Sequence, residues 1–235
     1  MEVRRSGRGL ALRIDGSFAS WWAPGRAASG SVWEALAAPL LLLRTPAPRV
    51  LLLGLAGGSA ARAARALLPA ARIVGVERDA EVLRAARRWF GLDALGLEAV
   101  EADARRYLAR TRRRFDAVIE DVFVGRGRAV HKPAWLPEPG LGLAARRLRP
   151  GGILVSNTLD ETAAVGRALA RRFPRVLSIG VRGWDNRVLV GARAGSGRGL
   201  RRAAARHPWL APALPCLRFE TAFSAGRPGT GARRG

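Results

Sequence analysis

A glycine-rich segment and an acid that follows it have the spacing of a nucleoside-binding site. Gly54, Gly57 and Gly58 come directly after the apolar run 50–53. Residues without side chains let a ligand approach the backbone, and amides at the start of a helix are donors to it. Glu77 ends a second apolar run, 19 residues after Gly58, close to the spacing of about 20 at which an acid accepts both hydroxyls of a ribose. The structural alternative is a plain tight turn followed by a surface acid.

Further polar residues follow later apolar runs. Asp103 follows the run 97–102, Asp121 lies near the end of the run 115–122, and a polar segment at 157–161 closes another run. Because parallel strands end at the same edge of a sheet, we expect these side chains to converge there. A carboxylate at that edge can hold and deprotonate an ammonium group. Each acid also has a structural alternative, since Asp103 can cap a helix and Asp121 can be an ordinary strand-end acid.

A parallel α/β sheet is needed to position these residues. Apolar runs alternate with helical segments, which favours right-handed crossovers, and two final strands predict an antiparallel hairpin. The expected strands are 50–53, 73–76, 97–102, 115–122, 153–157, 175–182 and 187–193, and the expected helices are 31–43, 59–68, 79–90, 104–113, 138–148 and 160–173. We expect a β-hairpin at 10–22, a loose end at 1–9, a short helix and a Pro-rich irregular stretch within 200–223, and disorder at 224–235.

Composition limits the classes of partner and site. The 235 residues carry a net charge of +23, almost all from arginine, and Lys132 is the sole lysine. Such a charge attracts nucleic acid non-specifically, so a nucleic-acid partner stays open but is not favoured. Cys216 is the only cysteine and there are two histidines, so we predict no disulfide and no metal.

The chain is expected to lie in the cytoplasm without a membrane partner. Its first residues lack an apolar stretch of signal-peptide length, and Arg44, Pro46, Pro48 and Arg49 interrupt the leucine-rich segment 35–55. We expect an N-terminal tail with a β-hairpin at 1–30, a cofactor-binding domain at 31–194 and a C-terminal extension at 195–235, partly disordered.

Six segments carry a resemblance to a known family. They are LLLGLAGGS (51–59), VGVERDAEVLRAARRWF (74–90), EADARRYL (101–108), FDAVIEDVF (115–123), LRPGGILVSN (148–157) and WDNRVLVGAR (184–193). Together they resemble class I S-adenosylmethionine-dependent transferases and, among these, the spermidine synthase family and its spermidine-synthase-like relatives. The resemblance runs from about Leu10 to Arg193 and implies an α/β, Rossmann-like class I methyltransferase fold. Its mostly parallel, seven-stranded sheet would end in an antiparallel hairpin, with a small β-hairpin before it.

The resemblance also implies an activity and its residues. The activity is transfer of an aminopropyl group to a small-molecule amine acceptor, as in polyamine biosynthesis, with S-adenosylmethionine or its decarboxylated form as cofactor. Glu77 and its neighbour Arg78 would bind the ribose, Asp103 and the Ala104 amide the adenine edge, and Asp121 would be the catalytic acid that faces the amine. The loop around the methionine-derived part would be Gly54, Ala56, Gly57 and Gly58.

Two departures from the family pattern keep other functions open. Ala56 stands where the family usually has glycine, and Val124 stands where polyamine synthases typically carry the second acid of a D-x-x-D pair. A diamine needs carboxylates to replace its hydration, which Asp121 supplies alone unless Asp160 and Glu161 contribute. Two alternatives to aminopropyl transfer therefore remain: methyl transfer, and a non-catalytic nucleoside- or nucleic-acid-binding module. A homodimer is also left open as a partner.

Several conspicuous residues are expected to be structural. Glu120 should point away from Asp121 and pair with an arginine. Trp21, Trp22 and Trp33 should pack in the core or the hairpin, and His131 should be a loop residue. Arg105, Arg106 and 112–114 should form a solvated face.

Overall fold

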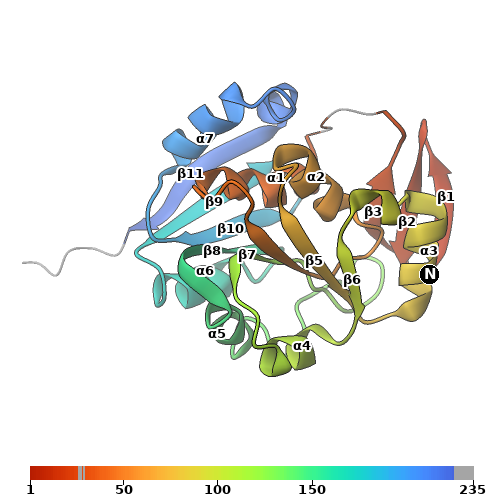
Figure 1. Cartoon of the computed structure of the whole chain (residues 1–235), viewed down its shortest axis with the longest axis horizontal. Helices are drawn as coiled ribbons and strands as arrows, with labels where there is room; N and C mark the ends of the chain where they lie inside the picture. The colour runs from red at the N-terminus through yellow and green to blue at the C-terminus, as the bar shows by residue number, and fades with distance from the viewer. Residues whose placement is uncertain (26–27, 29, 225–235) are drawn as a thin grey trace, which may run out of the picture.

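A computed structural model describes residues 1–25, 28 and 30–224. Its centre is an eight-stranded sheet in the order β11-β9-β10-β8-β7-β4-β5-β6 (Figure 1). Neighbouring strands from β8 through β7, β4 and β5 to β6 are parallel, whereas β10 and β11 pair antiparallel with their neighbours. The strands are β4 (Arg49–Leu53), β5 (Arg72–Glu77), β6 (Glu98–Glu101), β7 (Phe115–Glu120), β8 (Leu148–Thr158), β9 (Arg175–Val181), β10 (Arg187–Ala192) and β11 (Leu217–Ser224).

Helices cover both faces of this sheet, which explains why β4 has no polar alternation. Val50 and Leu52 belong to one apolar cluster, together with α1, α2 and α7, whereas Leu51 and Leu53 belong to a second cluster with α4, α5 and α6. A strand buried on both sides must be apolar throughout. The helices are α1 (Val32–Ala37), α2 (Ser59–Leu67), α3 (Ala80–Phe90), α4 (Ala104–Arg110), α5 (Gly140–Ala145), α6 (Thr162–Ala170) and α7 (Gly197–Arg206), with 3₁₀ turns η1 (Ala38–Leu42), η2 (Asp93–Leu95) and η3 (Ala211–Cys216).

Local signals in the sequence locate several helix ends correctly. Ser31, the first residue of the expected helix 31–43, forms a capping box with Glu34 at the start of α1. Asp79 caps α3 by accepting a hydrogen bond from the Glu81 amide at 2.8 Å, and Gly91 ends that helix in the left-handed conformation. Trp89 near the end of this helix is exposed, at 44%, although its residue type favours the core.

The N-terminal segment forms a sheet of three strands rather than a hairpin after a loose end. β1 (Glu2–Ser6) pairs antiparallel with β2 (Gly9–Ile14), and β2 pairs with β3 (Ser17–Trp22). The expectation for residues 1–9 is therefore wrong. β1 is an edge strand with polar, largely exposed side chains, so backbone pairing stabilises it and no apolar pattern marks it.

The C-terminal segment adds an eighth strand to the seven that were expected. After α7 and η3, β11 pairs with β9, starting with Leu217 opposite Val181. The irregular stretch expected up to residue 223 is therefore partly strand, because a long-range partner provides the pairing that the local sequence does not show. Ser224, expected to be disordered, is the last residue of β11, and 225–235 lie outside the described residues. Within the described part, no helix is long and apolar enough to cross a bilayer.

Candidate functional site

Strand register brings the ends of five strands to one edge of the sheet. Leu53 of β4 lies opposite Val76 of β5 and Glu120 of β7, while β5 and β6 end side by side and Glu120 lies opposite Ser156 of β8. The strand order reverses between β4 and β7, and ligands of such sheets bind in the crevice beyond this reversal. The residues at or just after these strand ends are Gly54, Glu77, Asp103, Asp121 and Asn157.

The glycine loop is in direct contact with the end of β7. The Asp121 amide donates to the Leu53 carbonyl at 2.9 Å. Gly54 has a φ of +85°, and a Cβ at this position would lie 2.5 Å from the Asp121 carbonyl oxygen. Glycine is therefore required at residue 54 both for its conformation and for space, and any side chain there would displace the candidate catalytic acid.

We expect Gly54→Ala to destabilise the protein by about 3 kcal/mol, because left-handed strain of about 1–2 kcal/mol is added to the clash with Asp121. Gly151→Ala is the matched control: Gly151 has a φ of +81° but open space around it, so only the strain of about 1–2 kcal/mol applies. Urea unfolding of both variants measures the difference, and equal costs would show that the contact with Asp121 is unimportant.

The amides of Gly57 and Gly58 are bonded within the protein. The Gly57 amide donates to Ser20 Oγ at 2.9 Å, and the Gly58 amide donates to the Leu55 carbonyl at 2.9 Å. Ser59 Oγ donates to the carbonyl of Trp21. The N-terminal sheet thus holds the loop in place, and the loop offers a ligand close approach rather than free amides.

Backbone amides fix the carboxylate of Glu77. Its Oε2 accepts from the Ala56 amide at 3.0 Å, and its Oε1 accepts from the amides of Arg78 at 2.9 Å and Asp79 at 3.2 Å. An ionised carboxylate has about four acceptor sites, so room remains for hydroxyl donors. Ala56 has a φ of +45°, a conformation that glycine adopts more easily.

Asp103 has the structural role that the sequence offers as its alternative, that of a helix cap. Its Oδ1 accepts from the Arg106 amide at 2.9 Å and caps α4, and Ala104 is the buried first residue of that helix. The Ala102 amide donates to the Glu77 carbonyl at 2.9 Å, so Asp103 follows directly after a residue bonded to the end of β5. A groove of about 510 Å³ continues from Asp103 between β6 and α4, where Arg106 and Arg110 line it.

Asp121 is the acid at this edge whose pKa is raised to about 7. Its half-buried carboxylate accepts from Asn157 Nδ2 at 2.8 Å, and Asn157 Oδ1 in turn accepts from Asn186 at 3.0 Å. Burial raises the pKa of Asp121 to about 7, against the opposing effects of Asn157 and Lys132, while Glu120 adds to the rise. A carboxyl with a pKa near neutrality can accept a proton from an ammonium group and release it.

The raised pKa predicts a pH-dependent gain in stability for Asp121→Asn. Between the ordinary pKa of 3.8 and about 7, the unfolded chain loses the Asp121 proton and the folded chain keeps it, so the wild type loses stability as pH rises through this window. The variant does not titrate here, so its advantage should be near zero at pH 4 and reach on the order of 3 kcal/mol at pH 8. Urea unfolding at both pH values checks this, and a constant difference would contradict it.

The prediction for Glu120 is wrong in its partner. Its carboxylate is buried and bonds Lys132 Nζ at 2.7 Å rather than an arginine, and Ser156 Oγ donates to its other oxygen at 2.5 Å. Sequence reasoning did not place Lys132 or Ser156 at the site, although Lys132 is conspicuous as the sole lysine. Val124 pairs through its backbone with His131, which confirms His131 as a loop residue.

Aromatic side chains form a cluster near the asparagine pair. The ring centroids of Phe18, Trp33 and Trp184 lie 5.5–5.8 Å apart, and Trp184 comes two residues before Asn186. Trp33 is buried in the core as expected, whereas Trp184 was not singled out from the sequence. Trp21 and Trp22 pack as expected: Trp21 Nε1 donates to the Ser6 carbonyl, and the Arg62 guanidinium lies over the ring of Trp22.

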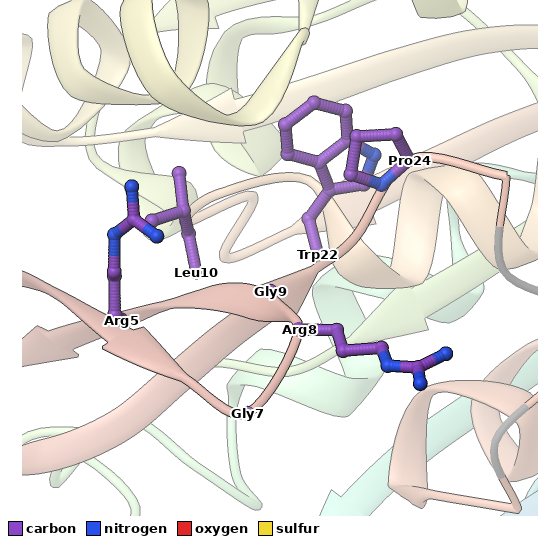
Figure 2. A pocket seen from close by; sticks show the side chains of 7 residues that line it. All are labelled: Arg5, Gly7, Arg8, Gly9, Leu10, Trp22 and Pro24. Carbon is purple, nitrogen blue, oxygen red and sulfur yellow. The ribbon is translucent and has the colours of Figure 1, made fainter.

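A separate hollow of about 290 Å³ lies on the N-terminal sheet (Figure 2). Figure 2 shows Trp22 and Pro24 close together and Arg8 extending away from them. None of the residues that follow the central strands lines this hollow, so it is distinct from the candidate site.

Comparison with known proteins gives one relative in sequence and several in structure. No protein-family model matches the chain. It is 30% identical over 164 residues to the eEF1A lysine and N-terminal methyltransferase of Danio rerio, a match that covers 62% of this chain and 23% of that protein. The chain therefore spans less than a quarter of the length of the curated relative it matches.

Solved structures of two kinds resemble most of the chain. A probable spermidine synthase from Corynebacterium glutamicum has a TM-score of 0.72 at 22% identity, covering 94% of this chain and 86% of that one. Human methyltransferase-like protein 13 in complex with SAH has a TM-score of 0.64 at 22% identity, covering 86% and 97%. Spermidine synthase from Thermotoga maritima has a TM-score of 0.62 at 17% identity, covering 83% and 72%.

These likenesses to solved structures cover 83–94% of the chain. At identities below 25% they show the fold and do not decide between spermidine synthases and methyltransferases. The expected fold is thus confirmed: the chain has a Rossmann-like class I methyltransferase fold, extended by β11 and by a small N-terminal sheet.

Proposed function

We propose that this protein is a transferase that uses S-adenosylmethionine to methylate an amine, with Asp121 as the general base. The observation that carries the proposal is the carboxylate of Asp121, which is half-buried, has a pKa raised to about 7 by burial, and directly adjoins the glycine loop. Among the described residues, no group donates to its Oδ2. One oxygen is thus held by Asn157 and the other is available to a substrate.

The order of groups along the sheet edge supports an adenosyl cofactor. From β4 to β5 to β6, the edge presents the glycine loop, then Glu77, then Asp103. This is the order of the methionine part, the ribose and the adenine in the cofactor. We therefore assign Gly54, Ala56, Gly57 and Gly58 to the methionine end, Glu77 with Arg78 to the ribose hydroxyls, and Asp103 with the Ala104 amide to the adenine edge. The methionine end, which carries the sulfonium, then lies at β4, the strand next to β7 and Asp121.

The chemistry needs a neutral amine and good alignment. Asp121 accepts a proton from the substrate ammonium, and the nitrogen lone pair then attacks the methyl carbon. The carbon–sulfur bond breaks, its electron pair goes to sulfur, and S-adenosylhomocysteine and a methylated ammonium leave. Because the positive sulfonium is already a good leaving group, the protein contributes mainly deprotonation and alignment.

The charge pattern favours a methyl group over an aminopropyl group. Glu120 is neutralised by Lys132, and Val124, which replaces the second acid of polyamine synthases, is paired with His131. In the segment 120–124, a polyamine would therefore meet one carboxylate without a paired cation, on a protein of net charge +23. The Danio rerio relative is described as a methyltransferase of lysine and N-terminal amines, which agrees with an amine acceptor. Aminopropyl transfer is the second candidate, supported by the likeness to a probable spermidine synthase over 94% of the chain.

Product analysis tests both candidates in one experiment. The protein is incubated with S-adenosylmethionine or its decarboxylated form, together with lysine peptides, peptides with a free N-terminus, or putrescine. We expect S-adenosylhomocysteine from S-adenosylmethionine with a peptide amine. Methylthioadenosine from the decarboxylated form with putrescine would establish the second candidate instead, and the absence of calorimetric binding of either cofactor at millimolar concentration would exclude both.

A further inference from the structure

The only lysine of the chain is buried next to the candidate catalytic acid. The sequence holds 41 basic residues, and 40 of them are arginine. The side chains of Lys132 and its partner Glu120 are each 1% exposed. Burying two charges has a high cost in free energy unless they are paired and hydrogen-bonded. The position of this pair in the interior therefore calls for a structural or functional reason.

The ammonium of Lys132 is held by the residues on both sides of Asp121. Nζ donates to Glu120 Oε1 at 2.7 Å and to the Val122 carbonyl at 3.0 Å. It also lies 3.9 Å from the ring centroid of Phe123, within the range of a cation–π interaction. The Glu120 side chain and the Val122 backbone, on either side of Asp121, are therefore bonded to one compact charge, a role that suits lysine better than the planar, forked arginine.

The same pair is tied to the neighbouring strand and helix. Ser156 of β8 donates to Glu120, while the next residue, Asn157, donates to Asp121. Adjacent residues of a strand point to opposite faces, so β8 bonds the two neighbouring acids from opposite sides. The Lys132 amide also donates to Glu161 at the start of α6, at 2.7 Å.

We propose that Lys132 is a positioning residue for Asp121: its ammonium neutralises Glu120 and holds the Val122 carbonyl, so that Asp121 is kept in place as the unpaired carboxylate of the reaction centre. The catalytic part of this inference rests on the proposed function. The contacts and charges around Asp121 belong to the protein itself and can be tested without a reaction. Without Lys132, a buried carboxylate directly adjacent in sequence would repel the charge of Asp121.

The charged groups around Asp121 define the expected shift. Lys132 lowers the pKa of Asp121 and Glu120 raises it, while burial has the largest effect. On the β8 side, Asp121 is bonded to Asn157, which carries no charge. Burial of Glu161 at the start of α6 opposes its ionisation, but amides that include those of Lys132 and Leu159 outweigh this and lower its pKa. Removing Lys132 alone therefore leaves Glu120 uncompensated, and removing both members of the pair cancels two opposing effects.

A three-variant titration tests the inference on the full chain without an acceptor. Protein labelled with ¹³C at aspartate carboxyls is titrated by NMR, and Asp121→Asn identifies the Asp121 signal. We expect Lys132→Met to raise the pKa of Asp121 by at least about 1 unit and Lys132→Met/Glu120→Gln to return it to within about 0.5 unit of the wild-type value. Arg149→Met is the matched control, because it removes a cation paired with Asp116 at the other end of β7, and it should leave the Asp121 signal unchanged.

The outcomes separate this inference from the proposed function. A pKa of Asp121 that is the same in the wild type, the single variant and the double variant would overturn the positioning role, whether or not methyl transfer occurs. If the single variant fails to fold, the neutral double variant decides, because the inference requires it to fold and to keep the wild-type pKa. Where transfer is measurable, the acidic limb of kcat/KM should shift with the NMR value, and an unshifted limb would overturn the role in catalysis.

Discussion

Replacing Asp121 with asparagine should lower the rate of transfer by about 10²–10⁴-fold, the usual contribution of a general base, while affinity for S-adenosylmethionine stays within about twofold. Asparagine keeps the shape of the side chain and an oxygen that can accept from Asn157, but it cannot take a proton. The separation of rate from affinity follows from position: Asp121 follows β7, whereas the residues assigned to the ribose and adenine lie at the ends of β5 and β6.

The pH profile gives the same prediction a second readout. Because burial raises the pKa of Asp121 to about 7, the ionised base is lost as pH falls through neutrality. The wild-type kcat/KM should therefore fall about tenfold per pH unit below pH 7, and this limb should be absent from the residual activity of the variant. Asp185→Asn, an exposed acid in the turn before β10, is the control and should leave rate and profile unchanged. A variant that keeps the wild-type rate would remove Asp121 from the chemistry.

The residues that meet at this edge of the sheet could be predicted from the sequence because their placement depends on few rules. Once alternating apolar runs identify parallel strands, the residues after each run must meet at one edge. Gly54, Glu77, Asp103 and Asp121 follow this rule, and the structure places them on neighbouring strands. The helix ends at Ser31 and Asp79 were predictable for a similar reason, since capping is a local property of a few residues.

Features that depend on long-range pairing could not be predicted in this way. β1 and β11 are strands because partners exist for their backbones, and neither has a continuous apolar pattern. The bond of the Gly57 amide to Ser20 links residues 37 positions apart. This hydrogen bond occupies an amide of the glycine loop, a contact that the local sequence does not predict. The pairing of Glu120 with Lys132 depends on the path of the loop after β7, which the sequence pattern does not define.

Two of these long-range contacts lie at the candidate site, where they limit what each residue can do. The N-terminal sheet holds the glycine loop through Ser20, and the Lys132 pair holds the segment around Asp121. Preorganisation of this kind is what a displacement reaction needs from a protein, because little else than alignment and proton transfer separates the reactants from products. Residues assigned to the cofactor should therefore affect binding more than rate.

Glu77→Ala is expected to weaken binding of S-adenosylhomocysteine by about 100-fold, because hydrogen bonds to a charged group contribute about 1.5–3 kcal/mol. Glu77→Gln keeps an acceptor oxygen without the charge and should weaken binding by about tenfold. Glu81→Ala is the matched control, since Glu81 lies in the first turn of α3 with its side chain exposed and paired at 3.5 Å with Arg84. Isothermal calorimetry measures all three.

A ligand without the 2′-hydroxyl separates contact with the ribose from support of the loop. Glu77 also accepts from the Ala56 amide, so Glu77→Ala could weaken binding only by loosening the glycine loop. If the carboxylate binds the ribose, the 2′-deoxy analogue should bind the wild type about tenfold more weakly than the parent compound, and this difference should vanish in Glu77→Ala. A difference that persists in the variant would assign Glu77 to the loop alone and leave the ribose to another residue.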